Sequence, residues 1–114
     1  MNYITDDYMR KMLKTTRRYT VVILHRTSKR GEPRADEIVW EHGRRNFELR
    51  RDGLLCVVGP AVKDESDVAG FCIFSTDLER TRRIMNEDPA VRAGIFAYDI
   101  HLMDSFPGDA LAEE

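Results

Sequence analysis

Four short runs rich in apolar and β-branched residues alternate with helical patterns along this chain, and the order of these patterns restricts the folds open to it. The strand-like runs lie at residues 19–25, 54–58, 71–74 and 95–103. Helical periodicity covers residues 35–51 and 76–87, and a shorter amphipathic helix is indicated at 6–18. After that first helix the order is therefore βαββαβ.

The βαββαβ order predicts an α+β fold of the ferredoxin-like type. With short connections and right-handed crossovers, such a chain forms a four-stranded antiparallel sheet with both helices on one face. The other face of the sheet is then left bare, and a small domain seldom exposes a broad apolar surface. We therefore expect a partner subunit, a ligand or RNA to cover it.

One domain accounts for most of the chain. Its 114 residues are 42% hydrophobic and 33% charged, as in an ordinary globular protein. We divide them into a helical arm at 1–18, a central domain at 19–106 and an acidic tail at 107–114. No apolar run approaches the roughly 20 residues that span a bilayer, and the acidic start is unlike a signal peptide. These features predict a cytoplasmic protein without a membrane partner.

The charge pattern argues against a nucleic-acid partner. Lys and Arg number 18 and Asp and Glu 20, for a net charge of −2. Phe71 and Phe74 are an odd number of residues apart, so in a regular strand they face opposite sides and form no stacking platform for RNA bases. The basic residues concentrate in the first 51 positions and the acidic ones in the rest. The simplest interpretation of that asymmetry is solvated faces or a subunit interface.

Local signals give two further expectations. Thr76 and Glu79 have capping-box spacing, so the Thr76 hydroxyl is predicted to cap the second long helix. Cys56 and Cys72 both lie in apolar runs and are too few for a disulfide framework, which favours buried reduced thiols.

His42 is the first candidate for a functional residue. On a helical wheel of residues 35–51 it falls on the inward arc with Ile38 and Leu49. An inward imidazole without a hydrogen-bond partner costs about 1–3 kcal/mol, so a partner is expected. Taken alone, such a residue is more often a packed histidine than a catalytic one.

Several motifs together resemble the YCII-related family over residues 19–103. The helical His42 is followed by Gly59-Pro60, by Gly70 at the third strand, and by Asp88-Pro89 with Gly94 before the last strand. This is the order and approximate spacing that the family has. The resemblance implies a homodimer in which two ferredoxin-like subunits build a dimeric α+β barrel around a cavity.

The resemblance also implies a catalytic pair. It assigns His42 as general acid or base and Asp88 as its orienting partner, with Gly59 and Pro60 shaping the substrate-binding rim. Apart from the resemblance, Tyr19 is a candidate to line the cavity and donate its hydroxyl to substrate, although aromatic residues on strands more often belong to the core. An Asp-Pro pair also commonly ends a helix by local hydrogen bonding, so a purely structural role for Asp88 stays open.

The sequence departs from the family pattern at two positions. Val39 stands where an Arg often precedes the family's histidine, and Arg26 stands near the place where other members carry an Asp. These departures leave open whether an anion site or a second carboxylate exists there.

A His–Asp pair favours proton transfer, because the carboxylate fixes the tautomer of the imidazole. Isomerisation or dehydrohalogenation of a small aromatic or dicarbonyl metabolite would need no metal or organic cofactor, and we expect neither. His25 and His101 lie on strands expected to be neighbours but have no third ligand, so no metal site is predicted. The alternative function is a non-catalytic dimer that binds or senses a small ligand.

Overall fold

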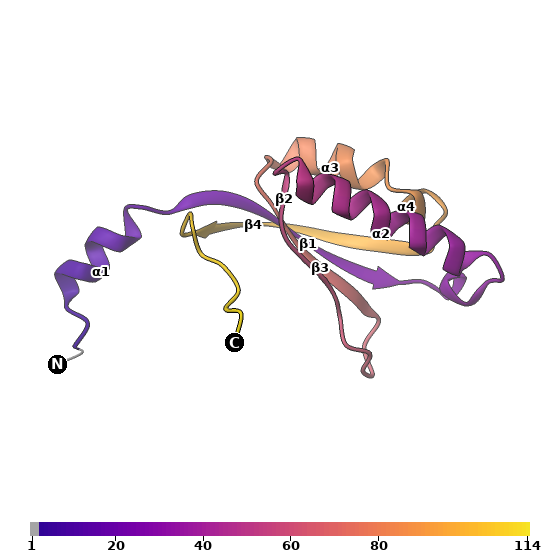
Figure 1. Cartoon of the computed structure of the whole chain (residues 1–114), viewed down its shortest axis with the longest axis horizontal. Coiled ribbons are helices and arrows are strands. Elements are labelled where there is room, and N and C mark those ends of the chain that lie inside the picture. Colours follow the sequence, from indigo (N-terminus) through magenta and orange to yellow (C-terminus); the bar gives the residue numbers. More distant parts are fainter. Residues whose placement is uncertain (1–2) are drawn as a thin grey trace.

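The computed structural model describes residues 3–114, so the first two residues of the expected arm lie outside the described part. One antiparallel sheet has the strand order β2-β3-β1-β4, and three helices cover one of its faces (Figure 1). A fourth helix, α1, projects away from the sheet at the N-terminal end (Figure 1). The strands are β1 (Arg17–Arg26), β2 (Leu55–Pro60), β3 (Val68–Phe74) and β4 (Phe96–Ser105). The helices are α1 (Asp6–Leu13), the 3-10 turn η1 (Ser28–Gly31), α2 (Ala35–Arg51), α3 (Leu78–Asn86) and α4 (Pro89–Arg92). The α+β, ferredoxin-like prediction is confirmed.

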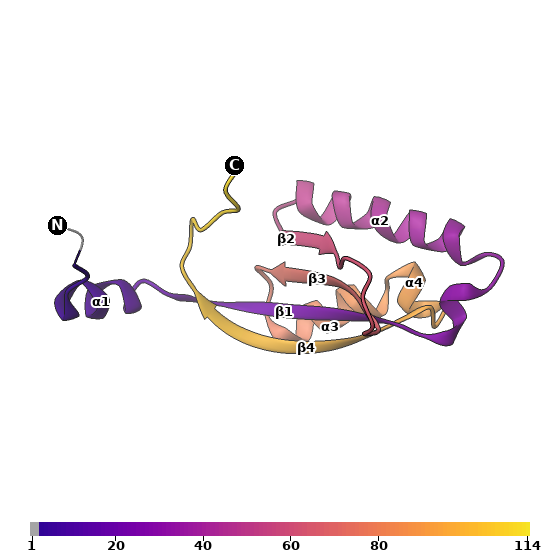
Figure 2. The same cartoon turned by 90° about the horizontal axis from the view of Figure 1, so that it is seen from below.

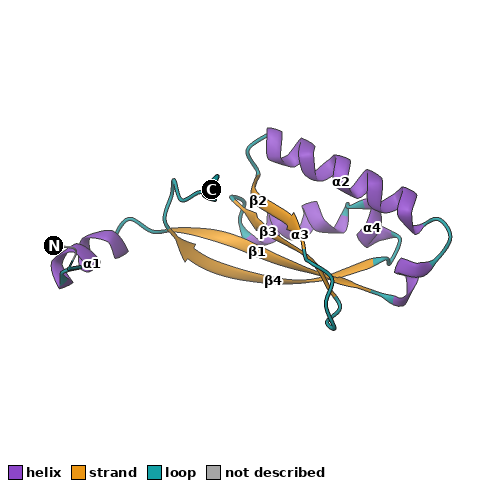
Figure 3. Ribbon diagram, turned by 60° about the horizontal axis from the view of Figure 1, so that its bottom comes forward, coloured by secondary structure: helices purple, strands orange, loops and turns teal. Residues whose placement is uncertain are grey.

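Helix α2 has the bounds that the periodicity predicts. Its first turn is acidic and its last turn is basic, which suits the helix dipole at both ends. Gly53 follows the C-cap with a φ of 78°, a left-handed conformation that favours glycine and ends the helix. Figure 3 shows α2 running beside β2, at the edge of the sheet. None of the helices within residues 3–114 is long and apolar enough to cross a bilayer.

The arm helix is shorter than predicted. α1 ends at Leu13, whereas Arg17 and Arg18 belong to β1 and pair with Ser105 and Asp104 of β4. The Arg18 guanidinium also bonds the Asp104 carboxylate, with Nε and Oδ1 2.7 Å apart. β1 and β4 thereby extend as a two-stranded ribbon beyond the other strands (Figure 2). The long-range pairing with β4 overrides the local helical pattern at these residues.

The predicted capping box is wrong by one residue. Asp77, not Thr76, caps α3, accepting a hydrogen bond from the Arg80 amide at 2.8 Å. Thr76 is buried instead, with its hydroxyl 2.7 Å from that of Thr81. A third threonine, Thr20 of β1, donates to the Thr76 carbonyl oxygen at 2.7 Å. These buried contacts tie the start of α3 to the sheet.

The core lies between the sheet and the helices. Phe74, Val22 and Leu55 are its largest fully buried apolar side chains. Cys72 is buried among them as expected, but Cys56 is exposed, so that half of the thiol prediction is wrong. The reason is a bulge in β2 between Leu55 and Val57, which takes the intervening residue out of the regular alternation.

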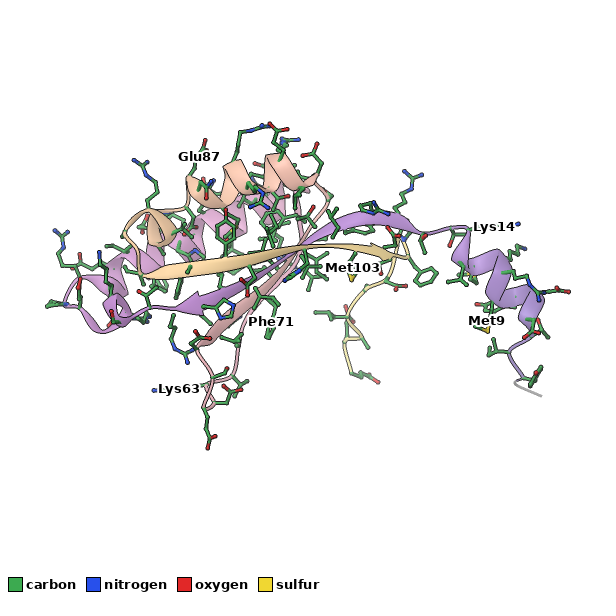
Figure 4. The ribbon with its side chains drawn as sticks, turned by 180° about the vertical axis from the view of Figure 1, so that it is seen from behind. Met9, Lys14, Lys63, Phe71, Glu87 and Met103 are labelled. Carbon is green, nitrogen blue, oxygen red and sulfur yellow. The ribbon has the colours of Figure 1, made fainter. Side chains whose placement is uncertain are left out.

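No helix of residues 3–114 covers the second face of the sheet. Val21, Ile23 and Ile73 are half-buried there, and Phe71 is 52% exposed. Figure 4 places the Phe71 side chain on the side opposite the helices. We call this surface the open face; it is apolar along the middle strands.

His25 makes a charged cluster on the open face. Its Nδ1 lies 2.7 Å from the Asp67 carboxylate and its Nε2 lies 2.8 Å from that of Asp99. Because carboxylates only accept, both ring nitrogens can donate only in the imidazolium form, and the two contacts favour that form. These hydrogen bonds, to Asp67 first and Asp99 second, raise the pKa of His25 above 6.5. The neighbour of His101 in β1 is Val21, so the two histidines do not meet.

We predict that His25 stabilises the fold in a pH-dependent manner. A raised folded pKa means that the contribution is fully present below pH about 6.5 and is lost as the pH rises through the folded pKa. His25→Gln should therefore lower the Tm more at pH 5.5 than at pH 9, measured by thermal unfolding. His101→Gln, an exposed histidine in the adjacent strand, is the control. An equal loss in Tm at both pH values would contradict the prediction.

Candidate active site

His42 and Asp88 are in direct contact inside the protein. His42 Nδ1 lies 2.7 Å from Asp88 Oδ1, and the two residues are 8% and 1% exposed. The inward stripe of α2 carries the imidazole, and the short connection from α3 to α4 carries the carboxylate. Two segments 46 residues apart in sequence thus meet at one buried hydrogen bond.

The two oxygens of Asp88 have separate partners. Oδ2 accepts hydrogen bonds from the backbone amides of Ala90 and Val91, at 3.0 and 3.2 Å, and so caps α4. Oδ1 accepts from His42, and the Arg45 guanidinium lies 3.7 Å from the same oxygen. Asp88 therefore has both roles: it caps α4, as an Asp-Pro pair commonly does, and it also bonds His42.

The surroundings keep Asp88 ionised at neutral pH. Burial taken alone raises the pKa of its carboxyl. The hydrogen bond and charge of His42, with the amides of Val91 and Ala90, outweigh burial, and the pKa is lowered overall. An ionised carboxylate only accepts, so His42 Nδ1 carries the hydrogen and donates it. In the neutral ring, Nε2 is then the atom with the free electron pair.

Asn46 is a site residue that the sequence analysis missed. One turn after His42 on α2, its Nδ2 lies 3.2 Å from His42 Nε2 and donates to it. The i, i+4 spacing on the inward stripe was the available signal. The imidazole also meets the Phe96 ring edge to face, with centroids 5.2 Å apart and an interplanar angle of 69°. These contacts fix the ring plane.

His42 lines a cavity of about 900 Å³ beside α2, β2 and β3. Gly59 and Pro60, predicted to shape the rim, line the same cavity as His42 and Asn46. Gly70 pairs with Pro60 of β2, and a Cβ on Gly70 would lie 3.2 Å from the Gly59 carbonyl oxygen. A side chain at this position would therefore crowd the β2 backbone, so glycine suits the close approach of β2 and β3 beside the cavity.

Tyr19 lies elsewhere. It lines a separate, more open hollow at the start of β1, with residues 14–18, Ser75 and Pro107. The structure therefore brings His42, Asp88, Gly59 and Pro60 together and does not bring Tyr19 to them. Within residues 3–114, no group of three or more His, Cys, Asp and Glu side chains is arranged to hold a metal ion.

Comparisons with known proteins give one family and one fold. The sequence profile of the YCII-related domain matches residues 19–104. A 5-chloro-2-hydroxyhydroquinone dehydrochlorinase from Burkholderia phenoliruptrix AC1100, solved with 2,5-dihydroxybenzoquinone, has a similar structure, with a TM-score of 0.56 at 18% sequence identity. The match covers 73% of this chain and 90% of the dehydrochlorinase chain. A comparison with curated proteins finds no match.

We predict that Asp88→Asn reverses the tautomer of His42. The new side-chain oxygen can keep the two amide bonds of the α4 cap, while the new NH₂ group points at Nδ1 and donates to it. The neutral ring should then carry its hydrogen on Nε2, which ¹⁵N NMR of the imidazole measures directly. Asp77→Asn, at the cap of α3, is the matched control. An unchanged Nδ1–H tautomer in Asp88→Asn would contradict the assignment.

Proposed function

The chain belongs to the YCII-related domain family, and on that premise we propose that it is a cofactor-independent enzyme in which His42 transfers a proton. The observation that carries the proposal is the 2.7 Å bond from His42 Nδ1 to buried Asp88, in a ring that also lines a cavity. Asp88 orients the ring, and its negative charge stabilises the imidazolium that forms when Nε2 takes a proton.

The chemistry follows from the free electron pair on Nε2. Nε2 removes a proton from a hydroxyl or from a carbon next to a carbonyl, and the electron pair of the broken bond moves into the conjugated system. Return of the proton to another carbon isomerises the substrate, whereas departure of a halide with the electron pair makes the reaction a dehydrohalogenation. Asn46 donates to Nε2, so this hydrogen bond must break before Nε2 can accept the substrate proton.

A small ring compound is the substrate class that we assign. The cavity volume of about 900 Å³ lies within the range of about 300–1,000 Å³ typical of small-molecule sites. Its walls include Val39, Val58 and Phe71, and Pro60 lies at the rim. The dehydrochlorinase of similar fold is solved with 2,5-dihydroxybenzoquinone, a small aromatic-type ring. That match supports a conjugated ring here.

We also propose that two copies pair through the open face to build a dimeric α+β barrel. Val21, Ile23 and Ile73 form an apolar band there that no helix of the described chain covers. A second copy covers the band with an identical one, as an isologous interface requires.

A non-catalytic binding module is the second candidate, and one observation favours it. Both ring nitrogens of His42 already have partners within the chain, Asp88 and Asn46. If the protein is a binding module, the imidazole helps to fix the cavity wall and does not transfer a proton. Turnover separates the two candidates.

His42→Ala should lower kcat by about 10²–10⁴-fold, because it removes the base. The assay measures chloride release from chlorinated hydroxyhydroquinones and deuterium exchange into small enolisable lactones and quinones. Glu41→Gln, one residue away on the exposed side of α2, is the matched control and should keep full activity. No turnover by the parent protein in either assay would leave the binding module as the function, whereas equal measurable rates for His42→Ala and the parent would show that His42 is not the base.

The parent protein should sediment at twice its chain mass of 13.2 kDa. Val21→Lys places a charge at the centre of the open face and should shift sedimentation to the monomer, since burying an unpaired charge is costly. Leu102→Lys changes an exposed apolar residue of β4, directly opposite Thr20 and so on the helix side of the sheet, and should leave the dimer intact. A parent protein that sediments at 13.2 kDa would overturn the dimer.

A further inference from the structure

The lining of the His42 cavity is basic, although the chain as a whole is slightly acidic. Arg26, Arg30 and Arg50 all line it, from β1, η1 and α2. Within residues 3–114, the acidic side chain of the lining is Asp109, an exposed residue of the C-terminal tail. Arg30 is paired with Asp36, and Arg26 and Arg50 still outnumber Asp109, so the lining favours anionic ligands.

Arg26 differs from the other two arginines in how it is held. Its guanidinium nitrogens donate to the backbone carbonyls of Val68 and Ser66, at 2.8 and 2.6 Å. Its own amide donates to the Asp67 carbonyl at 2.7 Å. Arg26 is half-buried and is fixed at the end of β1 by neutral groups. These neutral carbonyl partners hold the guanidinium in one orientation without neutralising its positive charge.

Within the described residues, no carboxylate lies within 4.0 Å of the Arg26 guanidinium, whereas Arg30 is paired with Asp36 at 2.8 Å. Asp64 and Asp67 lie close enough for Arg26 to help lower the pKa of each. The main cause is a hydrogen bond from Ser66 for Asp64 and from His25 for Asp67. Both carboxylates are exposed to solvent, which weakens their electrostatic attraction for the Arg26 guanidinium.

We propose that the cavity takes an aromatic or conjugated carboxylate, and that Arg26 forms the ion pair with the carboxylate group while the ring lies toward His42. Two of the five guanidinium N–H groups are used by Val68 and Ser66, which leaves three for a ligand. A planar guanidinium in a half-buried site recognises a carboxylate in two-point geometry better than a lone ammonium does. The inference rests on the proposed function, since it assigns a substrate class to the same site.

The test compares two ligands of the same ring and similar shape, one with a carboxylate and one with a neutral amide. 2,5-Dihydroxybenzoate and 2,5-dihydroxybenzamide have the same ring, and their affinities for the full-length protein are measured by calorimetry. Resonances of the His42 ring report by NMR whether each probe enters the cavity. The parent protein should prefer the carboxylate by about tenfold at low salt, and 0.5 M salt should shrink that preference.

Variants assign the preference to Arg26. Arg26→Gln should bind both probes equally, while Arg26→Lys, which keeps the charge, should retain part of the preference. Arg82→Gln, at an exposed arginine of α3 outside the cavity, is the control and should match the parent. If Arg26→Gln fails to fold, the salt dependence of the parent and the behaviour of Arg26→Lys still test the proposal.

Three results would overturn the inference: equal affinities in the parent protein, a tenfold preference that survives in Arg26→Gln, or no shift of the His42 ring with either probe. Failure of the proposed function gives a different result. In that case an Arg26-dependent preference is measured, yet His42→Ala turns over substrate as fast as the parent protein does.

Discussion

One buried carboxylate connects the helical layer of this protein. Asp88 binds α2 through Oδ1 and His42, and it caps α4 through Oδ2 and two backbone amides. A carboxylate that is 1% exposed is tolerated only when its oxygens are satisfied in this way. The same bonds that make its burial possible also fix the tautomer of the imidazole. Asp88 therefore both links α2 to α4 and sets the hydrogen-bonding state of His42.

Residues that line the cavity come from α2 and from the strands of the sheet. α2 supplies the imidazole and Asn46, the β2–β3 pair supplies a floor in which Gly59 and Gly70 approach closely, and the end of β1 supplies Arg26. No one element supplies all the groups that the proposed reaction needs. The sheet sets their spacing, because its register is specified along every strand by the buried face. A positive cavity in a chain of net charge −2 results from this arrangement alone.

The sequence predicts the repeating parts of the structure better than its boundaries. The bounds of α2 and the inward direction of His42 follow from a helical period over 17 residues. Predictions that depended on one or two residues did less well. The cap at Thr76 moved to Asp77 because buried threonine contacts compete for the hydroxyl, and Cys56 turned outward at a bulge that no periodicity reveals. Tyr19 fits a cavity-lining pattern but lies in another hollow.

By itself the sequence determined the βαββαβ order, the face of α2 that carries His42, and, through family resemblance, the choice of Asp88 as partner. These depend on periodicity and on motifs within short segments, which local chain geometry controls. The tertiary structure alone decided that Asp88 divides its oxygens, that Asn46 meets Nε2, and that Arg26 is held by carbonyls beside the same cavity. Those contacts join distant segments or depend on rotamers, and their geometry is set only when the whole core is packed.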